Sequence, residues 1–242
     1  MIQFAVLGYG TVGSGVVEVF FRNRESLEKK AGVPLGLKYI LDVREFPDSP
    51  YKDLFVKDFD TILNDASVGV VAEVIGGVEP ALTFTKACLE RGKSVVTSNK
   101  ELVAQHGAEL LAIARANNVN YLFEASVGGG IPIIRPLHSC LAANRIEEVI
   151  GILNGTTNFI LTKMFREGMS FESALALAQR LGYAERDPAA DVEGHDACRK
   201  ICILASLAFG EHVYPHDVSA EGITKITSED AAYAASCGCV IK

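Results

Sequence analysis

The sequence predicts an α/β fold, in which an N-terminal doubly wound parallel sheet is followed by a second, α+β domain. Two observations lead to this prediction. In the first half of the chain, short apolar runs alternate with amphipathic helical segments, as in parallel sheets that are covered by helices on both faces. After "EASVGGGIP", residues 124–132, the alternation stops and mostly helical segments follow. We therefore expect one domain over residues 1–125 and another over residues 126–242.

The expected elements follow from these patterns. In the first domain we expect strands at residues 2–7, 37–41, 70–75, 94–97 and 120–123, and helices at 12–30, 80–91 and 101–117. In the second we expect a strand at 146–153 and helices at 159–167, 171–181 and 194–209. Ser228 is placed to cap a further helix. A strand then begins at Cys239 and stops, which indicates a chain trimmed from a longer protein and a second domain that is incomplete at its C-terminus.

The composition is that of an acidic globular protein whose partners are small molecules. With 242 residues, 49% of them hydrophobic, the chain can bury one large core or two modest ones. A net charge of −7 argues against a nucleic-acid or membrane surface. No apolar run approaches the roughly 20 residues of a membrane span, and no signal peptide is recognisable. The six cysteines form no C-x-x-C pair, which favours buried thiols in a reducing cytoplasm.

The stretch "GYGTVGSG", residues 8–15, carries glycines in the spacing G-x-G-x-x-G between an expected strand and an expected helix. Gly8 permits a tight turn, Gly10 lets the backbone approach a pyrophosphate, and Gly13 lets helix and strand pack closely. This context favours a Rossmann-type dinucleotide site over a merely tight turn. At the end of the next strand, Asp42 could bind an adenosine ribose and Arg44 a 2′-phosphate, so NAD and NADP both remain open.

Three further loops carry polar residues, and the first two allow two interpretations each. In "VVTSNKELVA", residues 95–104, Lys100 follows a strand where ligands bind, or it is solvated while Ser98 or Asn99 caps the helix. In "FEASVGGGIPII", residues 123–134, Glu124 and nearby carbonyls could bind a hard cation, but the spacing alone favours a flexible glycine loop. In "NGTTNFI", residues 154–160, the polar groups could serve only the backbone.

The stretch "GYAERDPAADVEGHDACRK", residues 182–200, concentrates negative charge before a single lysine, Lys200. Its carboxylates are Glu185, Asp187, Asp191, Glu193 and Asp196. A metal cage, a charged surface loop or an amine-binding catalytic site would each explain it. The metal cage is disfavoured because Pro188 interrupts the stretch, the ligand positions of a calcium loop are missing, and Lys200 would repel a divalent ion.

Together these motifs resemble the homoserine dehydrogenase family, and the resemblance runs from residue 1 almost to residue 242. Its most specific pieces are "EASVGGGIP" and the acidic stretch that ends in Lys200. The resemblance implies NAD(P)-dependent interconversion of aspartate 4-semialdehyde and homoserine, in the synthesis of threonine, methionine and isoleucine. It also implies a second domain for catalysis and dimerisation, and a homodimer or homotetramer of the full-length protein. The alternatives are a dehydrogenase of another amino or oxo acid, or a dinucleotide-binding regulator without turnover.

The resemblance also implies which residues bind the cofactor and a cation. The cofactor loop would consist of Gly8, Gly10, Thr11, Val12 and Gly13. Thr11 and Val12 would lie close to the nicotinamide, and Ser98 and Lys100 beside cofactor and substrate. A monovalent cation, Na⁺ or K⁺, would bind Glu124 and the backbone carbonyls of Val127, Gly129 and Ile131.

For the substrate site, the resemblance implies contacts from Glu185 and Asp191, an active-site acid at Asp196, and a proton donor and acceptor at Lys200. This division suits the chemistry. Reducing an aldehyde by hydride transfer leaves negative charge on oxygen, which Lys200 would neutralise with a proton while Lys100 helps to polarise the carbonyl. Carboxylates would hold the substrate's ammonium group. Asp187 and Glu193 receive no role.

Overall fold

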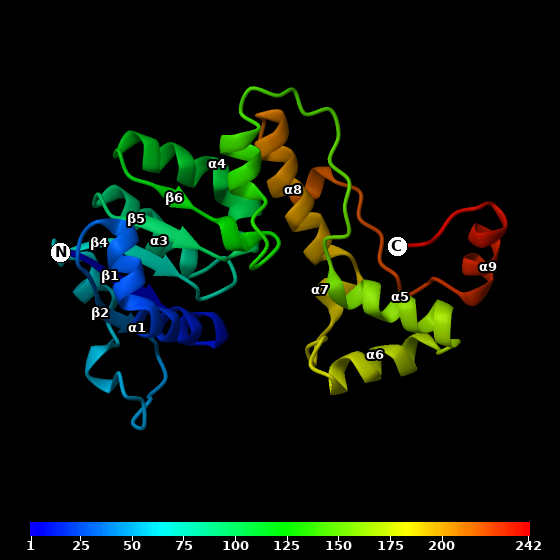
Figure 1. Ribbon diagram of the computed structural model, residues 1–242, viewed down its shortest axis with the longest axis horizontal. Coiled ribbons are helices and arrows are strands. Elements are labelled where there is room, and N and C mark those ends of the chain that lie inside the picture. Colours follow the sequence, from blue (N-terminus) through cyan, green and yellow to red (C-terminus); the bar gives the residue numbers. More distant parts are fainter. The chain divides into compact units, whose positions relative to one another are not determined.

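The computed structural model describes residues 1–242, which divide into two compact units, Met1–Leu141 and Ala142–Lys242 (Figure 1). The division falls later in the chain than residue 125. The reason is that Glu124 accepts hydrogen bonds from the backbone of residues 133–135, which ties this loop to the first unit.

The first unit contains a six-stranded sheet in which all strands run parallel. In sheet order the strands are β3 (Phe55–Val56), β2 (Leu35–Leu41), β1 (Ile2–Leu7), β4 (Val68–Glu73), β5 (Ser94–Thr97) and β6 (Tyr121–Leu122). The chain therefore builds outward from β1 in one direction and then restarts beside it with β4. Parallel α/β sheets bind ligands beyond the carboxyl ends of the strands at this kind of reversal. The predicted doubly wound sheet is confirmed.

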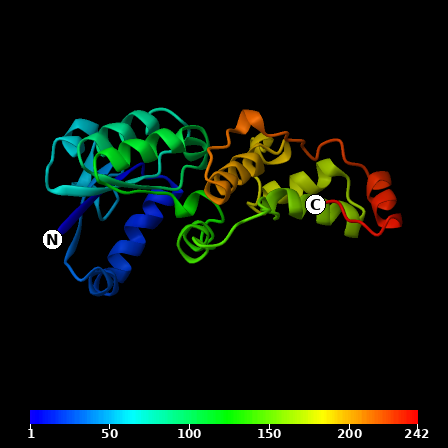
Figure 2. The ribbon, with the colours of Figure 1, turned by 90° about the horizontal axis from the view of Figure 1, so that it is seen from above.

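Helices cover both faces of this sheet. The helix α1 (Thr11–Ala31) lies on one face, and α3 (Ala81–Glu90) and α4 (Lys100–Ala116) lie side by side on the other (Figure 2). Between α1 and the sheet, a core forms from Val6, Val17, Phe20 and Ile40, all buried. The three helices begin and end within one residue of the expected bounds. β3 and the single-turn helix α2 (Phe59–Leu63) were not expected, because two to five residues show no periodicity.

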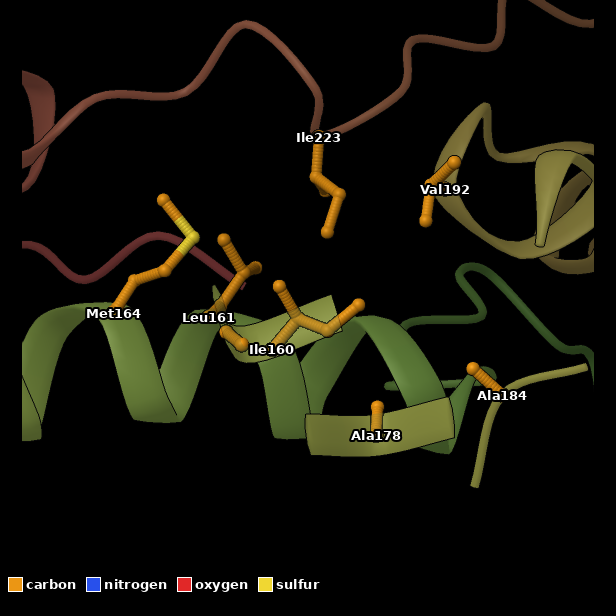
Figure 3. Packing of buried hydrophobic residues seen from close by; sticks show 8 residues of the cluster. Ile160, Leu161, Met164, Ala178, Ala184, Val192 and Ile223 are labelled. Carbon is orange, nitrogen blue, oxygen red and sulfur yellow. The ribbon is translucent and has the colours of Figure 1, made fainter. Parts of the chain in front are cut away.

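The regular structure of the second unit is helical. Its helices are α5 (Gly155–Glu167), α6 (Phe171–Arg180), α7 (Ala189–Val192), α8 (His195–Phe209) and α9 (Ser228–Ser236). Ile160, Leu161 and Met164 of α5 form the centre of a small core, against which Val192 of α7 and the loop residue Ile223 pack (Figure 3). Both units thus bury an apolar core of their own. No helix of the chain combines the length and the apolar character that crossing a membrane requires.

The expected strand at residues 146–153 does not form. The segment is without regular structure, and the side chains of Ile150 and Ile152 are 82% and 57% exposed. A strand needs hydrogen bonds from a neighbouring strand, and the second unit of this chain contains none. The β-branched and apolar residues typical of a strand are present in the sequence, but they do not by themselves supply a partner strand.

The C-terminal helix differs from the prediction at both of its ends. Thr227, and not Ser228, is the N-cap. Its hydroxyl accepts a hydrogen bond from the amide of Asp230 at 3.2 Å, while the Asp230 carboxylate accepts the Thr227 amide at 2.9 Å. Such a reciprocal capping box satisfies two amides that the first turn of a helix otherwise leaves unpaired. After the helix, the strand that was expected from Cys239 onward is absent.

Candidate functional site

The glycine loop between β1 and α1 is built around close backbone contacts. Gly8 has a φ of +97°, and a Cβ atom placed there would lie 3.0 Å from the carbonyl oxygen of Val74. At Gly13 a Cβ atom would lie only 1.9 Å from the carbonyl oxygen of Gly8. Gly10, by contrast, faces open space. The loop therefore packs tightly against the sheet at two glycines and leaves room for a ligand at the third.

The first turn of α1 is open to an anion. Gly10 is the N-cap and supplies no side-chain hydrogen bond, and no acidic residue stands in the first turn. Thr11 and Val12 begin the helix, and Val12 is 48% exposed. The unpaired amides and the positive end of the helix dipole together favour a phosphate group at this position.

A cavity of about 410 Å³ lies beside this loop in the first unit. Its lining includes Gly8, Gly10, Asp42, Arg44, Lys57 and Ile75. The structure thus brings together the glycine loop and the two residues that the sequence placed at the adenosine ribose. Lys57 was not foreseen, because it follows the short, unexpected β3 and carries no motif of its own.

The carboxylate of Asp42 is enclosed by protein donors. It accepts hydrogen bonds from the Tyr9 amide at 2.8 Å, the Arg44 amide at 2.9 Å, and the Arg44 Nε and Nη2 at 3.0 and 2.9 Å. The Arg44 guanidinium beside Asp42 holds the pKa of that carboxyl well below its usual range. The Arg44 side chain is itself 58% exposed, and Lys57 Nζ lies next to it, donating to the carbonyl oxygens of Val43 and Arg44. This end of the cavity therefore presents the cationic groups of Arg44 and Lys57, while the carboxylate of Asp42 is already occupied by protein donors.

A buried network joins the loops that follow β4 and β5. Glu73 is fully buried and accepts the Ile75 amide at 2.8 Å and the Thr97 hydroxyl at 2.7 Å. Thr97 in turn accepts the Asn99 amide at 2.9 Å, and Asn99 donates to the carbonyl oxygen of Gly77 at 2.6 Å. This chain of hydrogen bonds fixes the backbone on either side of Ser98.

The same loop shows which residue caps α4. Asn99, and not Ser98, is the N-cap of α4, since its side chain accepts the Leu102 amide at 3.1 Å. Lys100 is the first residue of the helix and is half-buried. Lys100 thus directly follows a buried, hydrogen-bonded residue at the carboxyl end of the sheet.

Glu124 organises the loop after β6. One of its oxygens accepts the amides of Ile133 and Ile134 at 2.7 and 3.0 Å, and the other accepts the amide of Arg135 at 2.7 Å. The intervening loop turns through Gly128, which has a φ of +80°. A Cβ atom placed at Gly128 would lie 2.8 Å from the carbonyl oxygen of Ile131. A glycine is therefore required by the backbone at Gly128, and Glu124 acts as the anchor of this turn.

The second unit contains a cavity of about 460 Å³ at the start of α5. It is lined by Asn154, Gly155, Thr156, Phe159, Tyr183, Asp191, Asp196 and Lys200. Three of the predicted site residues, Asp191, Asp196 and Lys200, are thus brought together. Glu185 is exposed and is not among the lining residues.

Lys200 is held inside this cavity by two acceptors. Its Nζ donates to Asp196 Oδ2 at 2.7 Å and to the carbonyl oxygen of Leu153 at 2.8 Å. The side chains of Lys200 and Asp196 are only 19% and 5% exposed. An ammonium group carries three N–H bonds, so one remains beyond these two contacts to donate to a ligand.

The remaining carboxylates of the acidic stretch have surface roles. Asp187 accepts the amide of Ala189 at 3.1 Å at the start of α7. Glu193 lies 3.2 Å from the ring of His195, and both side chains are more than half exposed. The surface-loop interpretation of this stretch therefore holds for Asp187 and Glu193, whereas Asp191, Asp196 and Lys200 share a cavity in which an amine could bind.

The fold and the glycine loop define a Rossmann-type nucleotide-binding protein with a separate helical unit. Comparison with known proteins then identifies its family. The sequence model described as the homoserine dehydrogenase NAD binding domain matches residues 8–124, and that described as homoserine dehydrogenase matches residues 132–242. The chain belongs to the homoserine dehydrogenase family.

Individual relatives agree with this assignment. The Bacillus subtilis homoserine dehydrogenase is 45% identical over all of this chain, which covers 56% of that protein. The crystal structure of a Thiobacillus denitrificans homoserine dehydrogenase is 41% identical with a TM-score of 0.92, over 100% of this chain and 56% of that one. A hyperthermophilic archaeal homoserine dehydrogenase mutant, solved in complex with NADPH, is 28% identical with a TM-score of 0.83, over 95% of this chain and 76% of that one. The chain thus spans a little over half the length of the first two.

Proposed function

We propose that the protein is a homoserine dehydrogenase, which interconverts homoserine and aspartate 4-semialdehyde with a nicotinamide dinucleotide. The observation that supports this most directly is the cavity in which Lys200, Asp196 and Asp191 meet. A bound dinucleotide would accept or supply the hydride. The chain's own residues must then bind the amino acid and move one proton at the substrate oxygen.

Lys200 is the proposed proton donor and acceptor. Its remaining N–H bond can reach a ligand in the cavity, and its ion pair with Asp196 holds the ammonium group in place while the oxygen acquires charge. Lys100 is proposed to assist by polarising the carbonyl, and Ser98 to contact the cofactor. Neither is among the residues that line the second unit's cavity.

Asp191 and Glu185 are proposed to hold the substrate's ammonium group. Asp191 lines the cavity and presents a half-buried carboxylate, which suits a charge-assisted hydrogen bond with little competition from water. Glu185 lies on the exposed segment after α6, so its part in binding rests on the family resemblance. In the first unit, Gly8, Gly10, Thr11, Val12 and Gly13 are the proposed cofactor loop.

An absorbance assay of the reduced nicotinamide tests the proposal. With homoserine as substrate, this chain or a longer natural form of it should reduce NAD⁺ or NADP⁺, whereas 4-hydroxybutyrate, which lacks the ammonium group, should react poorly. Efficient turnover of 4-hydroxybutyrate would point to a dehydrogenase of another acid. Dinucleotide binding without turnover of any of these compounds would support the regulatory alternative.

NADP(H) is proposed as the preferred cofactor, on the basis of Asp42 and its surroundings. A carboxylate that accepts ribose hydroxyls favours NAD, but here four N–H groups already occupy Asp42. The exposed guanidinium of Arg44 and the ammonium of Lys57 are instead suited to a 2′-phosphate.

Arg44→Ala should therefore weaken NADPH binding by about 10- to 100-fold, the range for losing a charge-assisted hydrogen bond to phosphate. NADH binding should hold or improve, since Asp42 becomes available to the ribose. Titration of each dinucleotide by fluorescence measures both effects. Arg22→Ala, which removes an exposed arginine paired with Glu18 on α1, is the matched control. An equal loss for NADH and NADPH would contradict the assignment.

A monovalent cation is proposed to bind the carbonyls of Val127, Gly129 and Ile131, with Glu124. The turn geometry suits this, because the φ values of +80° at Gly128 and +57° at Gly129 compact the loop that carries these carbonyls. Replacing K⁺ and Na⁺ with tetramethylammonium at constant ionic strength should lower turnover several-fold, because that ion cannot enter a carbonyl cage. A rate that is the same in all three salts would contradict the proposed site.

Two further expectations stay predictions. The family resemblance predicts a homodimer or homotetramer for the full-length protein. The cysteine pattern predicts a cytoplasmic location; of the thiols expected to be buried, Cys88, Cys198 and Cys202 are, whereas Cys140, Cys237 and Cys239 are exposed.

A further inference from the structure

Asn154 occupies an unusual position between two acids of the second unit's cavity. Its amide nitrogen donates to Asp191 Oδ1 at 2.6 Å and to Asp196 Oδ2 at 2.8 Å. Asp196 Oδ2 is the same oxygen that accepts from Lys200 Nζ at 2.7 Å. One side chain, only 7% exposed, thus links an acid of α7 to the acid that pairs with the lysine of α8.

The other end of the Asn154 side chain is fixed. Asn154 is the N-cap of α5, and its Oδ1 accepts the amide of Thr157 at 2.8 Å. This contact sets which way the amide nitrogen points, because the oxygen and the nitrogen of a planar amide face opposite directions. Both N–H bonds of the nitrogen are then used on the two carboxylates. The oxygen of the Asn154 side chain therefore caps the helix, while its nitrogen forms a bridge between the two carboxylates.

The bridge has an electrostatic consequence. Two carboxylates that face one cavity repel each other, and the amide's positive end between them offsets this repulsion. The Asn154 amide nitrogen also occupies only one oxygen of Asp191, so the second oxygen can accept a hydrogen bond from a ligand. An N-cap alone would not require this arrangement, since serine or threonine caps a helix equally well but has no amide nitrogen to donate.

We propose that Asn154 is a positioning residue that holds the Asp191 carboxylate at a fixed place beside the Lys200–Asp196 pair, so that Asp191 is presented to the substrate's ammonium group. This inference rests on the proposed homoserine dehydrogenase function of the cavity. It assigns to "NGTTNFI" a role beyond the capping of its own helix.

Asn154→Ser tests the proposal because it keeps the cap and removes the bridge. Homoserine binding, measured by calorimetry, and kcat/KM should both fall by about 10- to 100-fold, as for a displaced binding group. The dinucleotide affinity should stay close to that of the unchanged chain, and the midpoint of thermal unfolding should fall only modestly, because the helix cap is kept while two hydrogen bonds to carboxylates are lost. The matched control is Ser170→Asn, which exchanges the same two residue types at the N-cap of α6, where the side chain accepts the Ser173 amide and donates to the Ser173 hydroxyl. It should leave homoserine binding unchanged.

A double-mutant cycle with Asp191→Asn separates positioning from a general loss of structure. If Asn154 acts through Asp191, Asn154→Ser should have a much smaller effect in the Asp191→Asn background than in the unchanged chain. Fully additive effects, or an Asn154→Ser variant that binds homoserine as well as the unchanged chain, would overturn the proposal.

A crystal structure of the Asn154→Ser variant gives a readout that is independent of activity. The Asp191 carboxylate should move away from Asp196, while the Lys200–Asp196 pair persists. If the unchanged chain failed to bind or oxidise homoserine, the proposed function would fail, but this comparison would still decide the role of Asn154. An Asp191 carboxylate that keeps its place without the amide would refute that role.

Discussion

Replacing Lys200 with methionine should lower the rate of homoserine oxidation by roughly 10²- to 10⁴-fold, the range for losing a general acid–base group. Dinucleotide affinity should stay nearly unchanged, because Lys200 lies in the second unit and no residue of that unit lines the cavity at the glycine loop. Methionine fills most of the lysine stem's volume. The loss therefore reports on the ammonium group and its proton, as measured by steady-state kinetics and by dinucleotide titration.

Stability must be measured beside the rate, because the variant removes the ion pair between Lys200 and the buried Asp196. The Asp196 carboxylate is 5% exposed, and losing a buried ion pair destabilises the fold, by up to about 3 kcal/mol here. The double variant Lys200→Met with Asp196→Asn should recover stability but not turnover. Lys86→Met, which removes a lysine paired with Glu109 at 2.5 Å in the first unit, should leave turnover unchanged.

Lys200→Arg separates charge from proton transfer. The guanidinium can keep the ion pair with Asp196, but it does not release a proton near neutral pH. Oxidation should therefore remain slow in this variant even if it folds as well as the unchanged chain. An arginine variant with near-normal turnover would show that the cavity needs only a positive charge, and the proposed role of Lys200 would have to be given up.

The fold could be predicted from the sequence wherever the signal was local. Strand and helix periodicity, together with glycine spacing, predicted the strands and helices of the first unit and the tight turn at Gly8, because these depend on neighbours in the chain. The strand at residues 146–153 failed for the opposite reason: its pattern was present, but pairing depends on another segment. Periodicity therefore predicts which residues can form an element, and tertiary structure decides whether they do.

The candidate site shows the same limit at the level of side chains. The sequence grouped Asp191, Asp196 and Lys200 because they lie close together in one stretch. Asn154 is 37 residues before Asp191 and still donates to it, so no spacing rule could connect the two. Lys57 was missed at the cofactor cavity for the same reason, since only the short β3 brings it next to Arg44. The residues that sequence reasoning missed are those whose partners are distant in the chain.

Gly13→Ala should abolish dinucleotide binding. A Cβ atom at this position would lie 1.9 Å from the carbonyl oxygen of Gly8 and 3.2 Å from a side-chain carbon of Val74. A contact of 1.9 Å cannot be relieved by a side-chain rotation, because the nearer atom belongs to the backbone of the glycine loop. Either α1 moves away from the sheet or the Gly8 turn opens, and both displace the amides at the start of α1 that would receive the phosphates.

Gly15→Ala is the matched control two residues further along the same helix. No atom lies within 4 Å of a Cβ placed there, and alanine inside a helix is favoured over glycine by about 1 kcal/mol. This variant should unfold at a higher temperature and bind NADPH as well as the unchanged chain, whereas Gly13→Ala should unfold at a lower temperature, since overpacking typically destabilises by about 1–3 kcal/mol. Calorimetry of both variants measures binding and unfolding together. If Gly13→Ala bound NADPH normally, the close approach of α1 to the glycine turn would not be what shapes the phosphate site.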